Sequence, residues 1–360
     1  MPLDTIYLTR HGHRLNWTID YKTGTYHAQF PTPTGNPADP TLTSHGVRQS
    51  HELAAHFTSD NISPKPFRIY SSPFYRCLQT IQPTVEALKQ QQQQQASTTP
   101  ATNNEPPAID THADLTVRTE PGLGEWFGPT TFFHHPAPAP ASILSSHFPT
   151  ILPSSSSEQT TYTPILHPST RGETIAQLHD RVATTLSALI ISVDEEISTI
   201  EASLPPSQRT SKAILICSHA APLIAMGRAL TGNMPADSSV EDFKVYTAGV
   251  STFRRRRAGE GNREGEGDGG EGGGLAPGTE VVRGDDGGVK VPDWKGGKGV
   301  AGGWECVSNG DCAFLSGGAE RGWHFDGDES FDTGPMAGPS ATPTSSVDSS
   351  AETDLGGSKL

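Results

Sequence analysis

Histidine and arginine residues that directly follow short apolar runs are the side chains of this 360-residue chain best placed for chemistry. Imidazole is a nucleophile near neutral pH, and a guanidinium group grips an oxyanion through two parallel N–H groups. Three apolar runs each lead into polar residues suited to binding an anion: Arg10 and His11 follow the first, a turn with Ser72 and Arg76 follows the second, and His219 follows the third. These residue types predict one anion-binding site built from three places in the chain.

Glu125 is a candidate proton donor for that site. It lies in a turn over 120–128, between a glycine and the aromatic residues Trp126 and Phe127. Arg76 falls in the first turn of a predicted helix, where a cation opposes the helix dipole at a cost of a few tenths of a kcal/mol or more. An anion bound beside Arg76 would account for its position.

The apolar runs have the composition of buried strands in an α/β sheet, where ligands bind beyond the carboxyl ends of the strands. Gly12 lets the chain turn sharply as the first strand ends. The predicted strands cover 6–9, 67–70, 109–117, 213–217, 243–246 and 249–253, and the segment 243–253 pairs with 304–315. The predicted helices cover 43–57 with Thr43 as N-cap, 75–88, 172–200, and 222–230 with Gly232 near its end.

Composition favours a single domain over 1–335 followed by a disordered tail over 336–360. Polar, glycine-rich or proline-rich segments interrupt it, and we expect disordered insertions at about 90–107, in parts of 129–169 and at 254–303. The segment 16–34 is expected to form an ordered loop over the site. The net charge of −14 disfavours direct nucleic-acid binding, which needs a cationic face.

The sequence contains no recognisable secretory signal and no apolar run of membrane-spanning length. Its four cysteines form no CxxC pair and have no zinc-finger spacing, so we interpret them as reduced, mostly buried thiols. We therefore expect a cytoplasmic or nuclear protein, or one present in both, without a membrane partner.

Five motifs in order resemble those of the histidine phosphatase superfamily, also called phosphoglycerate-mutase-like. They are Arg10-His11-Gly12, the segment 39–49 with Asp39-Pro40 and Leu42-Thr43, the segment 71–80, the acid-bearing loop 122–128, and Ser218-His219-Ala220. The resemblance covers about 1–253 and 304–331. Arg14 is similar to an extra arginine of the branch that contains the ubiquitin-associated, SH3-containing tyrosine phosphatases and a fungal phosphatase-domain subunit of the RNA polymerase III initiation complex.

The resemblance implies a three-layer α/β/α sandwich with a mostly parallel central sheet. It implies catalytic roles for His11, Glu125, His219, Arg10 and Arg76, substrate-binding roles for Arg14, Asn16 and Ser72, and no metal or cofactor. His11 would accept the phosphoryl group and Glu125 would protonate the leaving oxygen. We expect Trp126 and Phe127 to raise the pKa of Glu125 by excluding water, which would keep it protonated.

Two functions from different classes follow. The first is a metal-independent phosphomonoesterase acting on a phosphorylated small molecule or a phosphoprotein. The second is a phosphatase-like scaffold subunit of a transcription complex, with protein partners and weak or no catalysis. A mutase activity is disfavoured because His13 stands where the family usually has a glutamate. A metal site at His11 and His13 is also disfavoured, because no second pair at ligand spacing accompanies them.

Overall fold

A computed structural model describes residues 2–97, 108–153, 162–257, 274–283 and 290–326. Its central sheet has six strands in the order β10-β8-β1-β7-β4-β5. Four neighbours, β1 (Thr5–Arg10), β7 (Ala213–Ser218), β4 (Pro66–Ser71) and β5 (Val117–Thr119), run parallel. The strands β8 (Val250–Arg255) and β10 (Trp304–Asp311) add an antiparallel edge.

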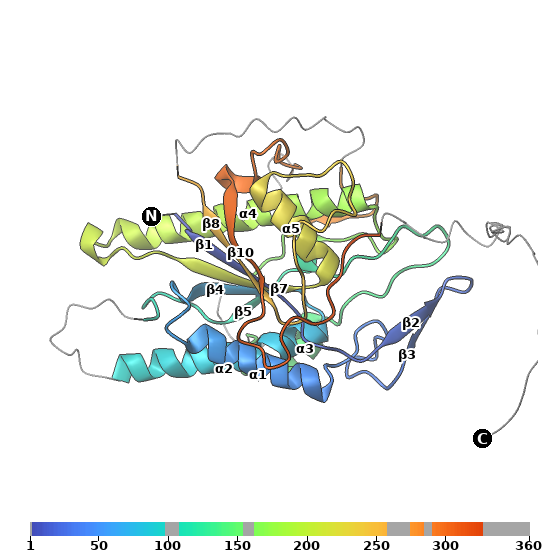
Figure 1. The fold of residues 1–360 in the computed structure, drawn as a ribbon, viewed down its shortest axis with the longest axis horizontal. Coiled ribbons are helices and arrows are strands. Elements are labelled where there is room, and N and C mark those ends of the chain that lie inside the picture. Colours follow the sequence, from blue (N-terminus) through green and yellow to red (C-terminus); the bar gives the residue numbers. More distant parts are fainter. Residues whose placement is uncertain (1, 98–107, 154–161, 258–273, 284–289, 327–360) are drawn as a thin grey trace, which may run out of the picture.

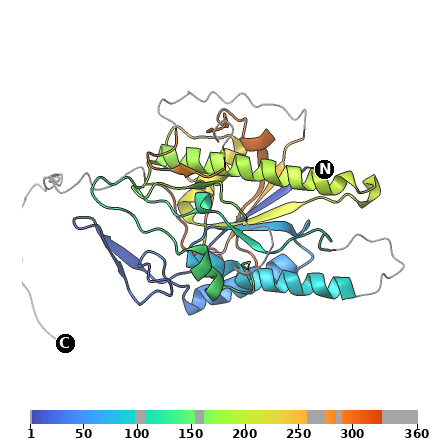
Figure 2. The ribbon, with the colours of Figure 1, turned by 180° about the vertical axis from the view of Figure 1, so that it is seen from behind.

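Helices cover both faces of this sheet, as Figures 1 and 2 show. On one face lie α1 (Ser44–Thr58), α2 (Tyr75–Ser97) and the short α3 (Ala141–His147). On the other lie α4 (Ile175–Ala202) and α5 (Ala220–Thr231). Each face has its own apolar core, as expected when both sides of the strands are buried. The predicted three-layer α/β/α fold with a mostly parallel sheet is confirmed.

Capping residues place the helix ends close to their predicted positions. The Thr43 side chain accepts a hydrogen bond from the Gly46 N–H and begins α1. Thr174 and Gln177 form a capping box at the start of α4. Gly232 ends α5 with a φ of 79°, a conformation that glycine adopts without steric cost.

Three predictions of local structure were wrong. The segment 16–34 contains a hairpin of β2 (Trp17–Asp20) and β3 (Thr25–Ala28) rather than only a loop. The segment 243–246 forms no strand. The side chains of Phe243 and Val245 are nevertheless buried in the core. In 109–117 only the last residue is in a strand, and Ile109 and Leu115 are instead buried in loop structure.

The predicted insertions are partly ordered. Helix α2 continues to Ser97, because glutamine is a good helix former and the side chain of Gln95 also bonds the Ile109 backbone. Residues 274–283 and 290–303 pack on the body of the protein: β9 (Glu280–Val281) pairs with β6 (Leu166–His167), and Trp294 is 1% exposed. Short 3-10 turns cover Pro121–Leu123, Pro206–Gln208 and Val300–Gly302. The remaining parts of 90–107, 129–169 and 254–303, and the tail over 336–360, lie outside the described residues.

Candidate active site

The parallel register of β1 and β7 brings two histidines together. Arg10 lies opposite Ser218, so His11 and His219 follow at adjacent strand ends. Their ring centroids are 5.4 Å apart. The strand β4 ends beside them, and the Ser72 backbone N–H donates to the Cys217 carbonyl. The three places singled out by sequence therefore meet at one edge of the sheet.

His11 is buried and its tautomer is determined by one contact. Its Nδ1 lies 2.8 Å from the Gly12 carbonyl oxygen, which can only accept, so Nδ1 carries the proton. The other ring nitrogen, Nε2, therefore keeps its lone pair in the neutral ring. Burial, and then the charges of Arg76 and Arg10, hold the pKa of His11 well below its usual value. The ring is neutral at physiological pH, as a nucleophile must be.

Arg76 is fully buried and held by two carboxylates. Its Nη1 donates to Asp39 Oδ1 at 3.0 Å, and its Nη2 donates to Glu125 Oε2 at 2.9 Å. Asp39 also accepts from the backbone N–H groups of Tyr75 and Arg76 at the start of α2. The anion expected beside Arg76 is thus in part the protein's own. Sequence reasoning identified Asp39 only as part of a motif, because its pairing with the start of α2 is long-range.

The expectation that the pKa of the Glu125 carboxyl group is raised was wrong. Burial does act to raise its pKa, but the charges of His219 and Arg76, with a hydrogen bond from His219, hold that pKa well below its usual value. Trp126 also faces elsewhere: its indole N–H donates to the Glu173 carbonyl, and its ring lies against Trp323 and Phe325. Glu125 is therefore ionised in the substrate-free protein, because neighbouring cations outweigh the aromatic surroundings.

His219 bridges several site residues. Its Nε2 lies 2.8 Å from Ser72 Oγ, and its Nδ1 lies 3.3 Å from Glu125 Oε2. Burial would lower the pKa of His219, but Cys77 and Glu125 raise it above its usual value. Burial would raise the pKa of the Cys77 thiol, but the neighbouring Cys217 and His219 lower it to about 6. The Ser72 hydroxyl, predicted to bind substrate, contacts His219 in this structure, and its substrate-binding role stays a prediction.

Arg10 and Arg14 border the same space. One amino group of Arg10 donates to the carbonyls of Val245 at 2.8 Å and Arg321 at 2.5 Å. Arg14 donates to the Leu15 carbonyl and lies over the Trp17 ring. Burial, together with neighbouring cations including Arg76, lowers the pKa of both guanidinium groups to about 10. Both remain charged at neutral pH.

Asn16 does not join this cluster. It is exposed before β2, where its backbone carbonyl accepts from the Gln29 N–H. No contact within the described residues joins its side chain to the histidines or arginines of the site.

A cavity of about 410 Å³ opens beside Glu125. Its walls are largely apolar and come from the turn before α3, from Phe74 and Phe127, and from the segment around β6. Its described lining has two acids, Glu125 and Glu280, and no lysine or arginine. A group entering this cavity from the site therefore meets proline, alanine and aromatic surfaces.

The donor atoms of His11, Glu125 and His219 lie within 4.8 Å of one another, a span that a metal ion could bridge. The charges around this trio oppose such binding. Arg76 pairs with Glu125, Arg10 and Arg14 add two further positive charges nearby, and Nδ1 of His11 is already bonded. A cation would be repelled where an oxyanion would be attracted.

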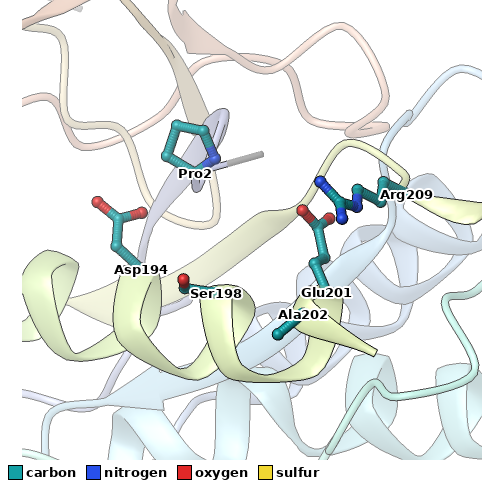
Figure 3. Close-up of a pocket in the computed structure, with 6 residues that line it drawn as sticks. All are labelled: Pro2, Asp194, Ser198, Glu201, Ala202 and Arg209. Carbon is teal, nitrogen blue, oxygen red and sulfur yellow. The ribbon is translucent and has the colours of Figure 1, made fainter. Parts of the chain in front are cut away.

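A second hollow, of about 420 Å³, lies between the chain start and the end of α4 (Figure 3). Pro2 and Arg209 there precede β1 and β7, so this hollow is at the opposite ends of the strands from the histidines. It holds none of the predicted site residues.

Among the described residues, no helix has the length and apolar character needed to cross a membrane.

Two sequence comparisons identify relatives. A family model described as the histidine phosphatase superfamily (branch 1) matches residues 6–98. The transcription factor tau 55 kDa subunit of Saccharomyces cerevisiae is 31% identical over 233 residues, which is 64% of this chain. The match spans 42% of that relative, less than half its length.

Solved structures with a similar arrangement include two phosphatases. An ecdysone phosphate phosphatase from Bombix mori is 17% identical with a TM-score of 0.46, and the match covers 69% of this chain and 88% of that one. A mycobacterial glucosyl-3-phosphoglycerate phosphatase is 15% identical with a TM-score of 0.38, covering 71% and 92%.

Proposed function

We propose that this chain, whose residues 6–98 match a model of the histidine phosphatase superfamily, is a metal-independent phosphomonoesterase with His11 as nucleophile. The observation that carries this proposal is the protonation of the His11 ring and the charge of its surroundings. Its ring is neutral, its Nδ1 proton is bound to the Gly12 carbonyl, and cationic side chains surround it. A phosphoryl group is the kind of anion that this arrangement attracts.

In the first step, His11 Nε2 attacks phosphorus and the ester P–O bond breaks. The phosphoryl group is then bonded to Nε2, and the leaving oxygen takes a proton from Glu125. The charges of Arg10, Arg14, Arg76 and His219 are in place beforehand, so they stabilise the transferring oxygens without reorganisation. Nε–H groups of Arg10 and Arg76 are buried without a partner in the described part of the chain, and both are donors for those oxygens.

In the second step, Glu125 accepts a proton from water, whose oxygen attacks the phosphohistidine. The P–N bond breaks, inorganic phosphate leaves, and His11 is neutral again. Glu125 is ionised before substrate binds, so it must gain the first proton on binding. A phosphoryl group brings negative charge and neutralises the cations that lower the pKa of Glu125, so binding favours proton uptake.

The cavity beside Glu125 narrows the substrate class. The ester oxygen must lie against Glu125, so the organic group leaves toward surfaces without lysine or arginine. An uncharged, apolar leaving group fits there better than a sugar bearing further phosphates. Phosphoproteins and small apolar monoesters both meet this requirement.

The test is hydrolysis of phenyl phosphate in EDTA by the full chain. We expect turnover in the native protein and a loss of about 10⁴-fold or more in His11→Ala. Acid-labile phosphate should be trapped on the native chain only. The control is His51→Ala, an exposed histidine of α1, which should keep native turnover. Turnover that survives His11→Ala, or that EDTA abolishes, would contradict the proposal.

A second candidate function is that of a phosphatase-like subunit in a transcription complex, located in the nucleus. It is favoured by the 31% identity to the yeast transcription factor subunit. Affinity purification of the tagged native chain should then recover RNA polymerase III factor subunits, with the same yield for His11→Ala. Recovery of those subunits without phenyl phosphate turnover would favour the scaffold over the enzyme.

A further inference from the structure

Cys77 is a buried thiol at the candidate site that the proposed reaction does not use. It follows Arg76 in the first turn of α2, and its side chain is 0% exposed. A thiol offers one weak S–H donor and a weak acceptor, so its partners decide what it can do.

The sulfur of Cys77 lies against the ring of His219. Cys77 Sγ is 3.6 Å from His219 Nε2 and 3.9 Å from Nδ1. Because the sulfur is almost equally far from the two nitrogens, it contacts the ring as a whole rather than the end of one N–H bond. The S–H group donates elsewhere, to the Ser218 carbonyl oxygen at 3.6 Å, which can only accept. The lone pairs of the sulfur therefore face the imidazole.

A second buried thiol fixes this arrangement. Cys217 precedes Ser218 at the end of β7, and its Sγ donates to the Cys77 carbonyl oxygen at 3.5 Å. The first turn of α2 is thereby tied to the end of β7 by both thiols. Cys217 is as deeply buried as Cys77, and its hydrogen bond is to the backbone of α2 rather than to His219.

The titratable groups around the His219 ring differ in the charge state that they favour. They are Arg76 and Cys77 from α2, Glu125 from its loop, His11 from the end of β1, and Asp39, whose pKa His219 lowers. Arg76 Nη2 is 3.1 Å from His219 Nδ1, so the burial of the ring and this cation both oppose a positive His219. The Cys77 sulfur and the Glu125 carboxylate, which is 3.3 Å from the same nitrogen, favour one.

Glu125 cannot give this support throughout the proposed reaction. It takes up a proton before it protonates the leaving oxygen, and a neutral carboxyl group no longer attracts an imidazolium ion. The Cys77 sulfur takes no part in that proton transfer, so its contact with the ring persists. With Ser72 Oγ, which is 2.8 Å from Nε2, it is then left to support the charged ring.

We propose that Cys77 is a positioning residue, which holds the His219 ring in place and keeps it cationic while the phosphoryl group is transferred to His11. The inference rests on the proposed function for that reaction. Cys77 acts through His219 rather than on the substrate.

The test follows the charge of His219 by ¹⁵N NMR of the histidine-labelled full chain during a pH titration, with resonances assigned through His219→Gln. We expect Cys77→Ala to lower the midpoint of the His219 titration by about 1 pH unit, a tenfold change in proton affinity. Cys77→Ser keeps an acceptor atom at the same place and should recover most of that shift. The matched control Cys217→Ala removes an equally buried thiol and should shift the midpoint less than half as far.

Hydrolysis of phenyl phosphate gives a second readout. The alkaline limb of kcat/KM against pH should move to lower pH in Cys77→Ala, so that kcat/KM above this limb falls about 10-fold, whereas Cys217→Ala should keep the native profile. Equal titration midpoints in the native chain and Cys77→Ala, or equal shifts in Cys77→Ala and Cys217→Ala, would overturn the inference. A native chain that does not hydrolyse phenyl phosphate would instead refute the proposed function, whatever the midpoints, so the two failures are distinguishable.

Discussion

At the scale of single residues, the site is governed by paired opposite charges. Glu125 and Arg76 hold each other ionised, and His219 lies within 3.3 Å of the same carboxylate. This pairing lets the chain keep a buried arginine aimed at the pocket, because a buried cation without a partner is costly. It also means that Glu125, the proposed proton donor, is ionised in the substrate-free protein.

Glu125→Gln should distinguish proton donation from simple positioning. We expect hydrolysis of an alkyl phosphate to fall by about 10²–10⁴-fold, because its leaving oxygen needs a proton. Hydrolysis of 4-nitrophenyl phosphate, whose leaving group is stable as an anion, should fall much less. The measurement is kcat/KM for the two esters, and an equal loss for both would contradict the assigned role.

Asp39→Asn should destabilise the protein by about 3–5 kcal/mol, because it removes a charge from the fully buried pair with Arg76. Denaturant unfolding of the full chain measures this loss. The control is Glu196→Gln, which weakens half-buried pairs with Arg68 and Arg118 and should cost roughly 1 kcal/mol or less. Similar losses for the two variants would contradict the larger stabilisation expected of the buried pair between Asp39 and Arg76.

At the scale of elements, α4 and α5 support the site from the face opposite α1 and α2. His179 on α4 is buried, with Nδ1 donating to the Ile175 carbonyl and its ring near Trp294. Burial, followed by the charge of Arg228, lowers the pKa of His179 to about 4. Protonation of this ring therefore favours the unfolded chain.

The consequence is a loss of stability in mild acid. An unfolded histidine takes up a proton near pH 6.5, whereas folded His179 does so only near pH 4. Between these values the unfolded state binds more protons, so stability falls as pH decreases from about 6.5 to about 4. Between pH 7 and pH 4.5, the native chain should lose roughly 2 kcal/mol more unfolding free energy than His179→Gln. Parallel losses in the two proteins would refute this assignment.

At the scale of the whole molecule, a segment expected to be disordered forms part of the body of the protein. Trp294 is 1% exposed and its indole N–H points to Asp180 at 3.4 Å. The backbone N–H of Gly297 also donates to the carbonyl of Gly232 at the end of α5. These contacts tie residues 290–303 to both helices of one layer.

Trp294→Ala should therefore cost about 3–5 kcal/mol of unfolding free energy, the usual range for emptying a buried tryptophan site. Val282→Ala, at a position that is 39% exposed, should stay within about 0.5 kcal/mol of the native protein. Denaturant unfolding monitored by far-UV circular dichroism compares the two. A small effect of Trp294→Ala would show that the segment is only loosely attached.

The sequence alone determined the residues that meet at the sheet edge, the three buried strands that carry them, and most helix starts. These features depend on local patterns: apolar runs, capping side chains and glycine at turns. Tertiary structure decided the charge on Glu125, the partner of Arg76, the buried position of Trp294 and the approach of Arg321 to Arg10. Each of these depends on contacts between residues far apart in the chain, and their strength follows from distance and burial, which composition does not encode.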